Sequence, residues 1–145
     1  MKDFLQELRV LLSYPRNLVL LGARLVVAYG FSTPALVKMN DPEGAITWFA
    51  SLGIPFPDLM AYTVAGLEST GVVLLILGLF TRPISLLLSF VMVGAILFVH
   101  QGHGFAAAAN GIEIPLLYGT LLWVFVTRGA GRYSLDHWLL GDHHD

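Results

Sequence analysis

The chain has 145 residues, of which 56% are hydrophobic and 12% are charged. A soluble domain has about 25% charged residues, so this chain lacks the polar side chains that would cover a soluble surface, and its composition predicts a membrane protein. The net charge of −2 with eight scattered basic residues excludes a basic face for nucleic acid, and the absence of cysteine excludes disulfides and cysteine-held metal clusters.

Residues 1–13 predict an amphipathic helix that lies on the membrane surface. At helical spacing, apolar side chains fall on one face and polar side chains fall on the other. We therefore expect residues 1–17 to form a cytoplasmic interfacial segment ahead of the first membrane span. The apolar face comprises Phe4, Leu5, Leu8, Leu11 and Leu12, and the polar face comprises Lys2, Asp3, Gln6 and Arg9.

Four apolar segments predict membrane-spanning helices. A helix needs about 17–25 residues to cross a bilayer, and the third and fourth segments are at the short end of that range. Residues 44–52, between the first two segments, predict a second interfacial helix. We expect an all-α integral membrane four-helix bundle over residues 18–128, followed by a cytoplasmic tail over residues 129–145. The segments are Leu18–Leu36, Met60–Phe80, Ile84–Val99 and Ile112–Thr127.

The basic residues predict which way the helices cross the membrane. Six of them fall in the N-terminal segment, the loop after the second span and the C-terminal tail, whereas the other two loops hold only Lys38. Positively charged loops stay on the cytoplasmic side, so we expect four spans with both termini cytoplasmic. The six residues are Lys2, Arg9, Arg16, Arg82, Arg128 and Arg132.

Two ionisable residues lie well inside the predicted spans, Arg24 in the first and Glu68 in the second. Each costs roughly 2.5–3.5 kcal/mol at the centre of a membrane helix, so each requires a partner or a purpose. At about 1.5 Å per residue, the two differ in depth by roughly 9 Å, a gap that two long side chains nearly close. We therefore expect an Arg24–Glu68 ion pair, direct or bridged by water. The pair is either a structural staple or the charged floor of a binding cavity.

Polar residues gather at the outer ends of the predicted spans. His100 and His103 are three residues apart, and Asn110 and Glu113 follow them. Imidazole and carboxylate together suit a divalent transition metal, with His100, His103 and Glu113 as ligands, and they equally suit proton transfer to a quinone. Both interpretations compete with a third, in which these are ordinary exposed residues. Because only His100 lies near a span, we expect no haem in this chain.

Several short motifs follow one another along nearly the whole chain. They are Gly22-x-Arg24-Leu25, Lys38, Gly53-Ile54-Pro55, Ala65-Gly66-x-Glu68-x-x-Gly71, Gly78-Leu79-x-Thr81-Arg82, His100, Gly111-x-Glu113-x-Pro115-Leu116 and Gly131-Arg132-x-Ser134-Leu135-Asp136. Their order and spacing resemble the DoxX family of small four-span membrane proteins. The Gly-Pro-Gly that usually precedes the last motif is Gly129-Ala130-Gly131 here. Within the family, the chain is most similar to the HvfX-type members, which accompany small secreted metal-binding peptides called bufferins.

This resemblance implies a four-helix bundle in the membrane. The cofactor that it most readily implies is a quinone. The family takes its name from a subunit of a thiosulfate:quinone oxidoreductase. Other members are similar to membrane partners of redox-stress enzymes or of methylamine dehydrogenase maturation. The HvfX-type likeness implies a role in metal homeostasis instead.

We therefore predict a bacterial inner-membrane protein that is the membrane subunit or partner of a redox or stress-response system. It would exchange protons and electrons with a quinone in an outward-facing cavity, with His100 or Glu113 moving protons and Arg24 holding a charged oxygen. Whether the chain is itself an enzyme is left open. In this interpretation it would be a non-autonomous subunit of a quinone-linked oxidoreductase. The cavity candidates are Arg24, Lys38, Glu68, His100, Asn110 and Glu113.

Two other functions fit the same residues. The first is handling or transport of a metal ion, such as copper, or of a metal-loaded peptide. The second is a non-catalytic membrane anchor that docks a soluble partner through its interfacial helices. In each case the lipid bilayer is a partner and nucleic acid is not, and rows of small residues in the spans also permit a homo-oligomer.

Overall fold

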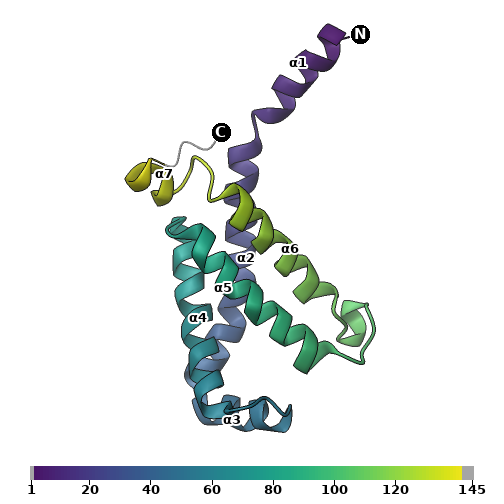
Figure 1. Ribbon diagram of the computed structural model, residues 1–145, viewed down its shortest axis with the longest axis vertical. Coiled ribbons are helices and arrows are strands. Elements are labelled where there is room, and N and C mark those ends of the chain that lie inside the picture. Colours follow the sequence, from purple (N-terminus) through teal and green to yellow (C-terminus); the bar gives the residue numbers. More distant parts are fainter. Residues whose placement is uncertain (1, 142–145) are drawn as a thin grey trace.

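In the computed structural model, which describes residues 2–141, every regular element is helical (Figure 1). The all-α prediction is therefore confirmed. The elements are α1 (Lys2–Ser13), α2 (Arg16–Asn40), α3 (Pro42–Ser51), α4 (Pro57–Leu77), α5 (Thr81–Gly94), the π-helical η1 (Ala95–His100), the 3₁₀-helical η2 (Ala107–Ala109), α6 (Glu113–Arg128) and α7 (Leu135–Leu140).

Three stretches are long and apolar enough to cross a membrane: Asp3–Asn40, Pro57–Leu77 and Thr81–His100. They contain α2, α4 and the continuous rod of α5 and η1. The fourth predicted span, α6, has 16 residues. At about 1.5 Å per residue it extends roughly 24 Å, which is short of a hydrocarbon core of about 30 Å.

The four long helices pack in two pairs, α2 with α4 and α5 with α6, and α4 also contacts α5. Small residues permit the close approach, since a Cβ added to Gly71 of α4 would press against Leu88 of α5. Large apolar side chains cover most of the outer surface of these helices, as expected of a surface that faces lipid. The interior is filled by Leu20, Val27, Ala28, Phe31, Leu75, Ile84, Leu88, Leu122 and Phe125.

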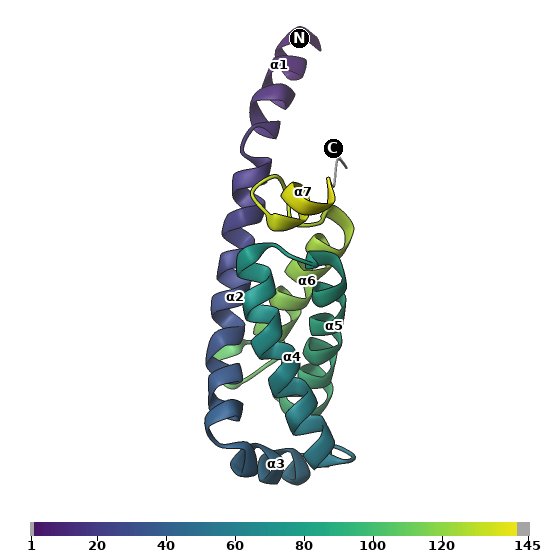
Figure 2. The same ribbon diagram turned by 90° about the vertical axis from the view of Figure 1, so that its left-hand side faces the viewer.

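The two ends of the bundle carry opposite charge. One end, which we call the basic end, holds the start of α2, the α4–α5 turn, the end of α6 and α7 (Figure 2). Its arginines are Arg16, Arg82, Arg128 and Arg132. The opposite end, which we call the acidic end, holds α3 and the connection from η1 to α6. Its carboxylates are Asp41, Glu43, Asp58 and Glu113.

Helix α1 extends from the basic end, away from the bundle (Figures 1 and 2). A break at Tyr14 and Pro15 separates it from α2. The apolar side chains of α1, including Phe4, Leu8 and Leu11, are exposed. An amphipathic helix whose apolar face no other described residue covers is typical of a segment that lies on a membrane surface.

Candidate functional site

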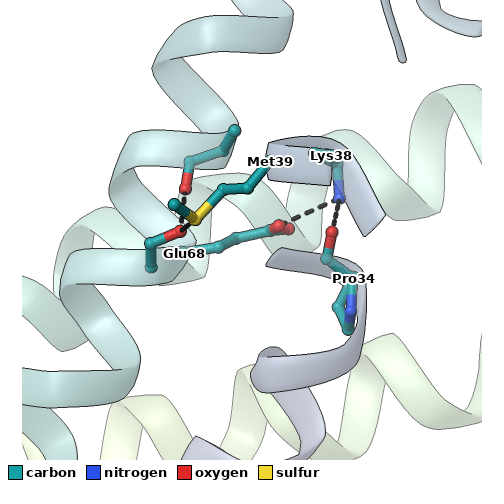
Figure 3. A network of polar contacts seen from close by, with 6 residues as sticks. Pro34, Lys38, Met39 and Glu68 are labelled. Atoms are coloured by element: carbon teal, nitrogen blue, oxygen red, sulfur yellow. Dashed lines mark hydrogen bonds and ion pairs between the residues drawn. The ribbon is translucent and has the colours of Figure 1, made fainter. Parts of the chain in front are cut away.

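An ion pair is buried between α2 and α4. Lys38 Nζ lies 2.9 Å from Glu68 Oε2, and the two side chains are 9% and 4% exposed (Figure 3). Lys38 reaches α4 because α2 continues as a helix through Pro34 to Asn40, which places Lys38 one turn beyond Pro34. A charge inside a membrane helix requires a partner, and each member of this pair is the partner of the other.

The contacts around this pair leave hydrogen-bonding capacity unused. Lys38 Nζ also donates to the Pro34 carbonyl at 3.3 Å, and an ammonium group has three N–H donors, so one remains. Within residues 2–141, no hydrogen bond reaches the second oxygen of Glu68, Oε1. On the exposed side of the same two helices, Ser69 Oγ lies 2.9 Å from Met39 Sδ (Figure 3). The pair can therefore hydrogen-bond one further polar group as both donor and acceptor.

Arg24 lies nearer the basic end and does not contact Glu68. Its side chain is fully buried and donates to the carbonyl oxygens of Leu75, at 2.8 Å, and of Tyr133. Leu75 is about two turns beyond Glu68 along α4. The predicted Arg24–Glu68 pair is therefore wrong, because Lys38 neutralises Glu68 and the backbone of α4 and of the C-terminal segment solvates Arg24.

The C-terminal segment folds back over the basic end, and we call residues 131–136 the C-terminal clasp. The carboxylate of Asp136 accepts hydrogen bonds from the backbone N–H groups of Phe80, at 2.7 Å, and Thr81, at 2.9 Å. Asp136 thereby caps α5 from a distant part of the chain. Its own N–H donates to the Gly78 carbonyl at 2.9 Å. The clasp thus ties the end of the chain to the α4–α5 turn.

Gly78 permits this docking. It ends α4 with a φ of 67°, a conformation that glycine adopts without steric cost. A Cβ at this position would collide with the guanidinium of Arg24 and with the Cβ of Ser134, which lies in the clasp. The clasp and Gly78 therefore pack tightly against the guanidinium of Arg24, and this side chain acts as a structural cross-link between α2, α4 and the clasp. Its Nε is buried and has no hydrogen-bond partner within residues 2–141.

The connection from η1 to α6 is stabilised by hydrogen bonds of His100 and Glu113. His100 Nδ1 lies 2.8 Å from the Asn110 carbonyl oxygen, and Glu113 Oε2 accepts from the Ala107 N–H at 2.7 Å. A ring nitrogen that faces a carbonyl oxygen must carry the proton, which leaves Nε2 of His100 as the basic nitrogen. His103, which is exposed, donates its backbone N–H to the His100 carbonyl at 3.2 Å.

Over residues 2–141, no three His, Asp or Glu side chains form a group that could hold a metal ion. The predicted ligand set of His100, His103 and Glu113 therefore gains no support from the geometry. Among the predicted site residues, side-chain contacts join Lys38 to Glu68 and His100 to the Asn110 backbone. Arg24 belongs to a separate network at the basic end.

Comparison with known proteins identifies the family. Residues 19–101, more than half of the chain, match the model of the DoxX family. The chain belongs to the DoxX family. The resemblance predicted from the motifs is thus confirmed at the level of the family. No solved structure matches this chain.

Three relatives illustrate how this DoxX protein is related to bacterial membrane proteins. A protein of Haemophilus influenzae, named only as uncharacterized, is 38% identical over 79% of this chain and 85% of its own length. The inner membrane protein YphA of Escherichia coli is 32% identical over 83% of this chain and 90% of YphA. CatD of Bacillus subtilis, a candidate oxidoreductase by its name, is 37% identical over 52% of this chain and 55% of CatD. The family and YphA support a place in the bacterial inner membrane.

Sequence reasoning identified Lys38 as a candidate but assigned it to a loop, and it missed the capping role of Asp136. The signal for Lys38 was its position four residues after Pro34, on the same helix face if the helix continues. The signal for Asp136 was weaker. Ser134-x-Asp136 places an acidic residue in the first turn of a helix, and Ser134 does accept from the His137 N–H, but nothing local indicates that Asp136 caps a different helix.

Proposed function

We propose that this DoxX protein is a membrane subunit or partner of a redox system, and that it binds a quinone headgroup at the Lys38–Glu68 pair. The observation that carries the proposal is the pair itself, a buried ammonium and carboxylate 2.9 Å apart with unused hydrogen-bonding capacity. The pair replaces the Arg24-based site expected from the sequence, since Arg24 is occupied by backbone carbonyls.

The residues at the pair suit the chemistry of a quinone, which accepts two electrons and two protons when it is reduced. The remaining N–H of Lys38 would donate to a quinone carbonyl oxygen. Glu68 would hold a proton at Oε1, since a carboxyl group next to an ammonium in a dry site can exchange protons with a bound ligand. His100, at the end of η1 in the same half of the molecule, would supply the second proton, which its Nε2 would take up from water and pass on to the quinone.

Electrons would come from a partner protein, because the chain has no cysteine for an iron–sulfur cluster and its residues 2–141 form no metal-ligand group. The relationship to CatD, a candidate oxidoreductase by its name, supports a redox context. The protein would then be a non-autonomous part of an oxidoreductase rather than an enzyme by itself.

The distribution of charge supports a topology of four spans with both termini in the cytoplasm. The basic end carries four arginines outside the bundle interior, and the basic residue expected among the outer loops, Lys38, is neutralised inside the bundle instead. Among the described residues, the acidic end therefore has no free Lys or Arg to oppose this orientation. We retain the three-part organisation of residues 1–17, 18–128 and 129–145 as part of this proposal.

A binding titration tests the proposal. The purified protein in quinone-free nanodiscs is titrated with a short-chain ubiquinone analogue, and binding is followed by tryptophan fluorescence and by native mass spectrometry. We expect one quinone per chain and at least a tenfold weaker affinity in the Lys38→Gln/Glu68→Gln double variant, which corresponds to about 1.4 kcal/mol. Asp58→Asn, which removes an exposed carboxylate at the same end, is the matched control and should bind like the parent protein.

Other outcomes would contradict this function. Unchanged affinity in the double variant, or no binding by the parent protein, removes the proposed site. A metal ion that co-purifies and is lost in His100→Ala would favour metal handling, in line with the predicted HvfX-type likeness. A chain that retains only a soluble partner would favour the membrane anchor, and the same spectra report whether the protein is a homo-oligomer.

A further inference from the structure

Three arginines at the basic end are exposed and form no ion pair with any residue of the described range 2–141. They are Arg16 at the start of α2, Arg128 at the end of α6 and Arg132 in the C-terminal clasp. Over residues 2–141 the single ion pair is Lys38–Glu68, so none of the three has a carboxylate partner. Three guanidinium groups to which residues 2–141 supply no counter-charge are available to an anionic ligand.

The clasp holds the backbone of Arg132 against α2, one residue after Arg16. The backbone N–H of Arg132 donates to the side chain of Asn17, the neighbour of Arg16, at 3.1 Å. The next two residues are fixed as well, since the Tyr133 carbonyl accepts from Arg24 and Ser134 Oγ donates to the Gly131 carbonyl at 2.6 Å. Arg132 therefore projects from an ordered segment, and a ligand that binds it does not have to order the loop first.

The position of these arginines matches the level of lipid headgroups. Arg16 and Arg128 are the first and last residues of helices whose outer surfaces are apolar. Large apolar side chains lie exposed at the same level, including Leu18, Tyr133 and Trp138. Aromatic side chains of this kind are typical of the membrane interface, where basic residues attract anionic lipid headgroups. A soluble acidic partner would instead require the charges to stand clear of the apolar surface.

We propose that Arg16 and Arg132, with Arg128 at the same end of the bundle, form a binding site for the phosphate of an anionic phospholipid. Two guanidinium groups that approach one phosphate provide several charge-assisted hydrogen bonds in a planar fork. A zwitterionic lipid gains less from these bonds, because its own ammonium group already partly neutralises its phosphate. The site lies at the opposite end from the Lys38–Glu68 pair and does not depend on quinone binding. Its role would be to fix the clasp, and through it the α4–α5 turn, against the membrane surface.

Native mass spectrometry of the full-length protein from nanodiscs tests the site, with an equimolar mixture of phosphatidylcholine and phosphatidylglycerol as the probe. We expect the parent protein to retain phosphatidylglycerol in preference. The Arg16→Gln/Arg132→Gln double variant should reduce that preference about tenfold. The matched control is Lys2→Gln/Arg9→Gln, which removes two positive charges from α1 and should keep the preference.

The outcomes separate the site from a general effect of charge. An unchanged preference in Arg16→Gln/Arg132→Gln, an equal loss in both double variants, or retention of an acidic soluble protein in place of lipid would overturn the proposal. If the double variant does not fold, Asn17→Ala answers the same question, because it keeps both arginines but releases the Arg132 backbone. A clear loss of preference in Asn17→Ala supports the site, and no loss contradicts it.

Discussion

The two buried cations of this protein, Arg24 and Lys38, lie on the same helix but are stabilised in opposite ways. Arg24 donates to backbone carbonyls of α4 and of the clasp, whereas Lys38 forms an ion pair with a carboxylate. Backbone carbonyls do not titrate and cannot move without unfolding a helix or a turn. A carboxylate can exchange a proton and keeps an oxygen free. Arg24 therefore stabilises the fold, whereas Lys38, with its carboxylate partner, can take part in proton transfer.

The largest loss of stability is expected when Arg24 is removed. In Arg24→Met, the Leu75 and Tyr133 carbonyls lose their buried donor, and the clasp loses one of its links to α2 while the contact between the Arg132 N–H and Asn17 remains. We expect the free energy of unfolding, measured by denaturation in detergent micelles, to fall by about 3–5 kcal/mol. Arg24→Lys should recover only part of that loss, because an ammonium cannot reach both carbonyls in the fixed geometry of a guanidinium. A loss below about 1 kcal/mol in Arg24→Met would show that the network is dispensable.

Neutralising the Lys38–Glu68 pair tests the other half of the comparison. Lys38→Met alone leaves a buried, unpaired carboxylate and should cost about 3 kcal/mol of unfolding free energy. The double variant Lys38→Met/Glu68→Leu removes both charges and should be nearly as stable as the parent protein, since an apolar pair suits an apolar surrounding. A double-mutant cycle by the same denaturation measures the coupling. Equal losses in the single and double variants would mean that the pair is needed for the fold.

Gly78 and Gly53 form a matched pair that isolates the packing around Arg24. Both have a positive φ, 67° and 74°, but a Cβ at Gly78 meets Arg24 and Ser134, whereas a Cβ at Gly53 meets nothing within 4 Å. Gly53→Ala should therefore cost only the backbone strain, about 1 kcal/mol. Gly78→Ala should cost about 2 kcal/mol or more, because the clasp must also shift. Thermal unfolding of the two variants in the same detergent gives the difference, and equal melting temperatures would refute close packing at Gly78.

The smallest predicted effect concerns the cap that Asp136 provides. Asp136→Asn keeps the shape of the side chain but weakens the hydrogen bonds from the Phe80 and Thr81 N–H groups. We expect a loss of about 1 kcal/mol, as for other helix caps. Hydrogen exchange at the start of α5 should rise, while exchange around Glu68 stays unchanged. Faster exchange in both regions would indicate that the Arg24 network and the Lys38–Glu68 pair are coupled and do not act independently.

The sequence was sufficient for the long helices but not for the partners of the buried charges. Apolar runs located α2, α4, α5 with η1, and α6 to within a few residues, because each helix satisfies its own backbone and needs only a lipid-like surface. The first run ended in the prediction at Leu36, and Lys38 was assigned to the loop after it. Helix α2 instead continues to Asn40, and this extension turns Lys38 towards Glu68.

The partners of Arg24 could not be found by an estimate of depth. That estimate compared ionisable side chains within spans, but the groups that solvate Arg24 are carbonyl oxygens, which every residue has and no motif marks. One of them, on Tyr133, is 109 residues away in the chain. The apolar character of the long helices could be read from the sequence for the converse reason, because it depends on residue type alone.

The separation of Arg24 and Tyr133 along the chain also determines when the contacts of Arg24 can form during synthesis. At about 5–20 residues per second, the ribosome adds those 109 residues in roughly 5–20 seconds. Before that interval ends, α2 and α4 are complete while Arg24 still lacks one of its two carbonyl partners. A segment synthesised after all four long helices therefore completes the surroundings of Arg24 in α2. A protein shortened before Tyr133 would retain all four long helices and still be unable to finish assembly.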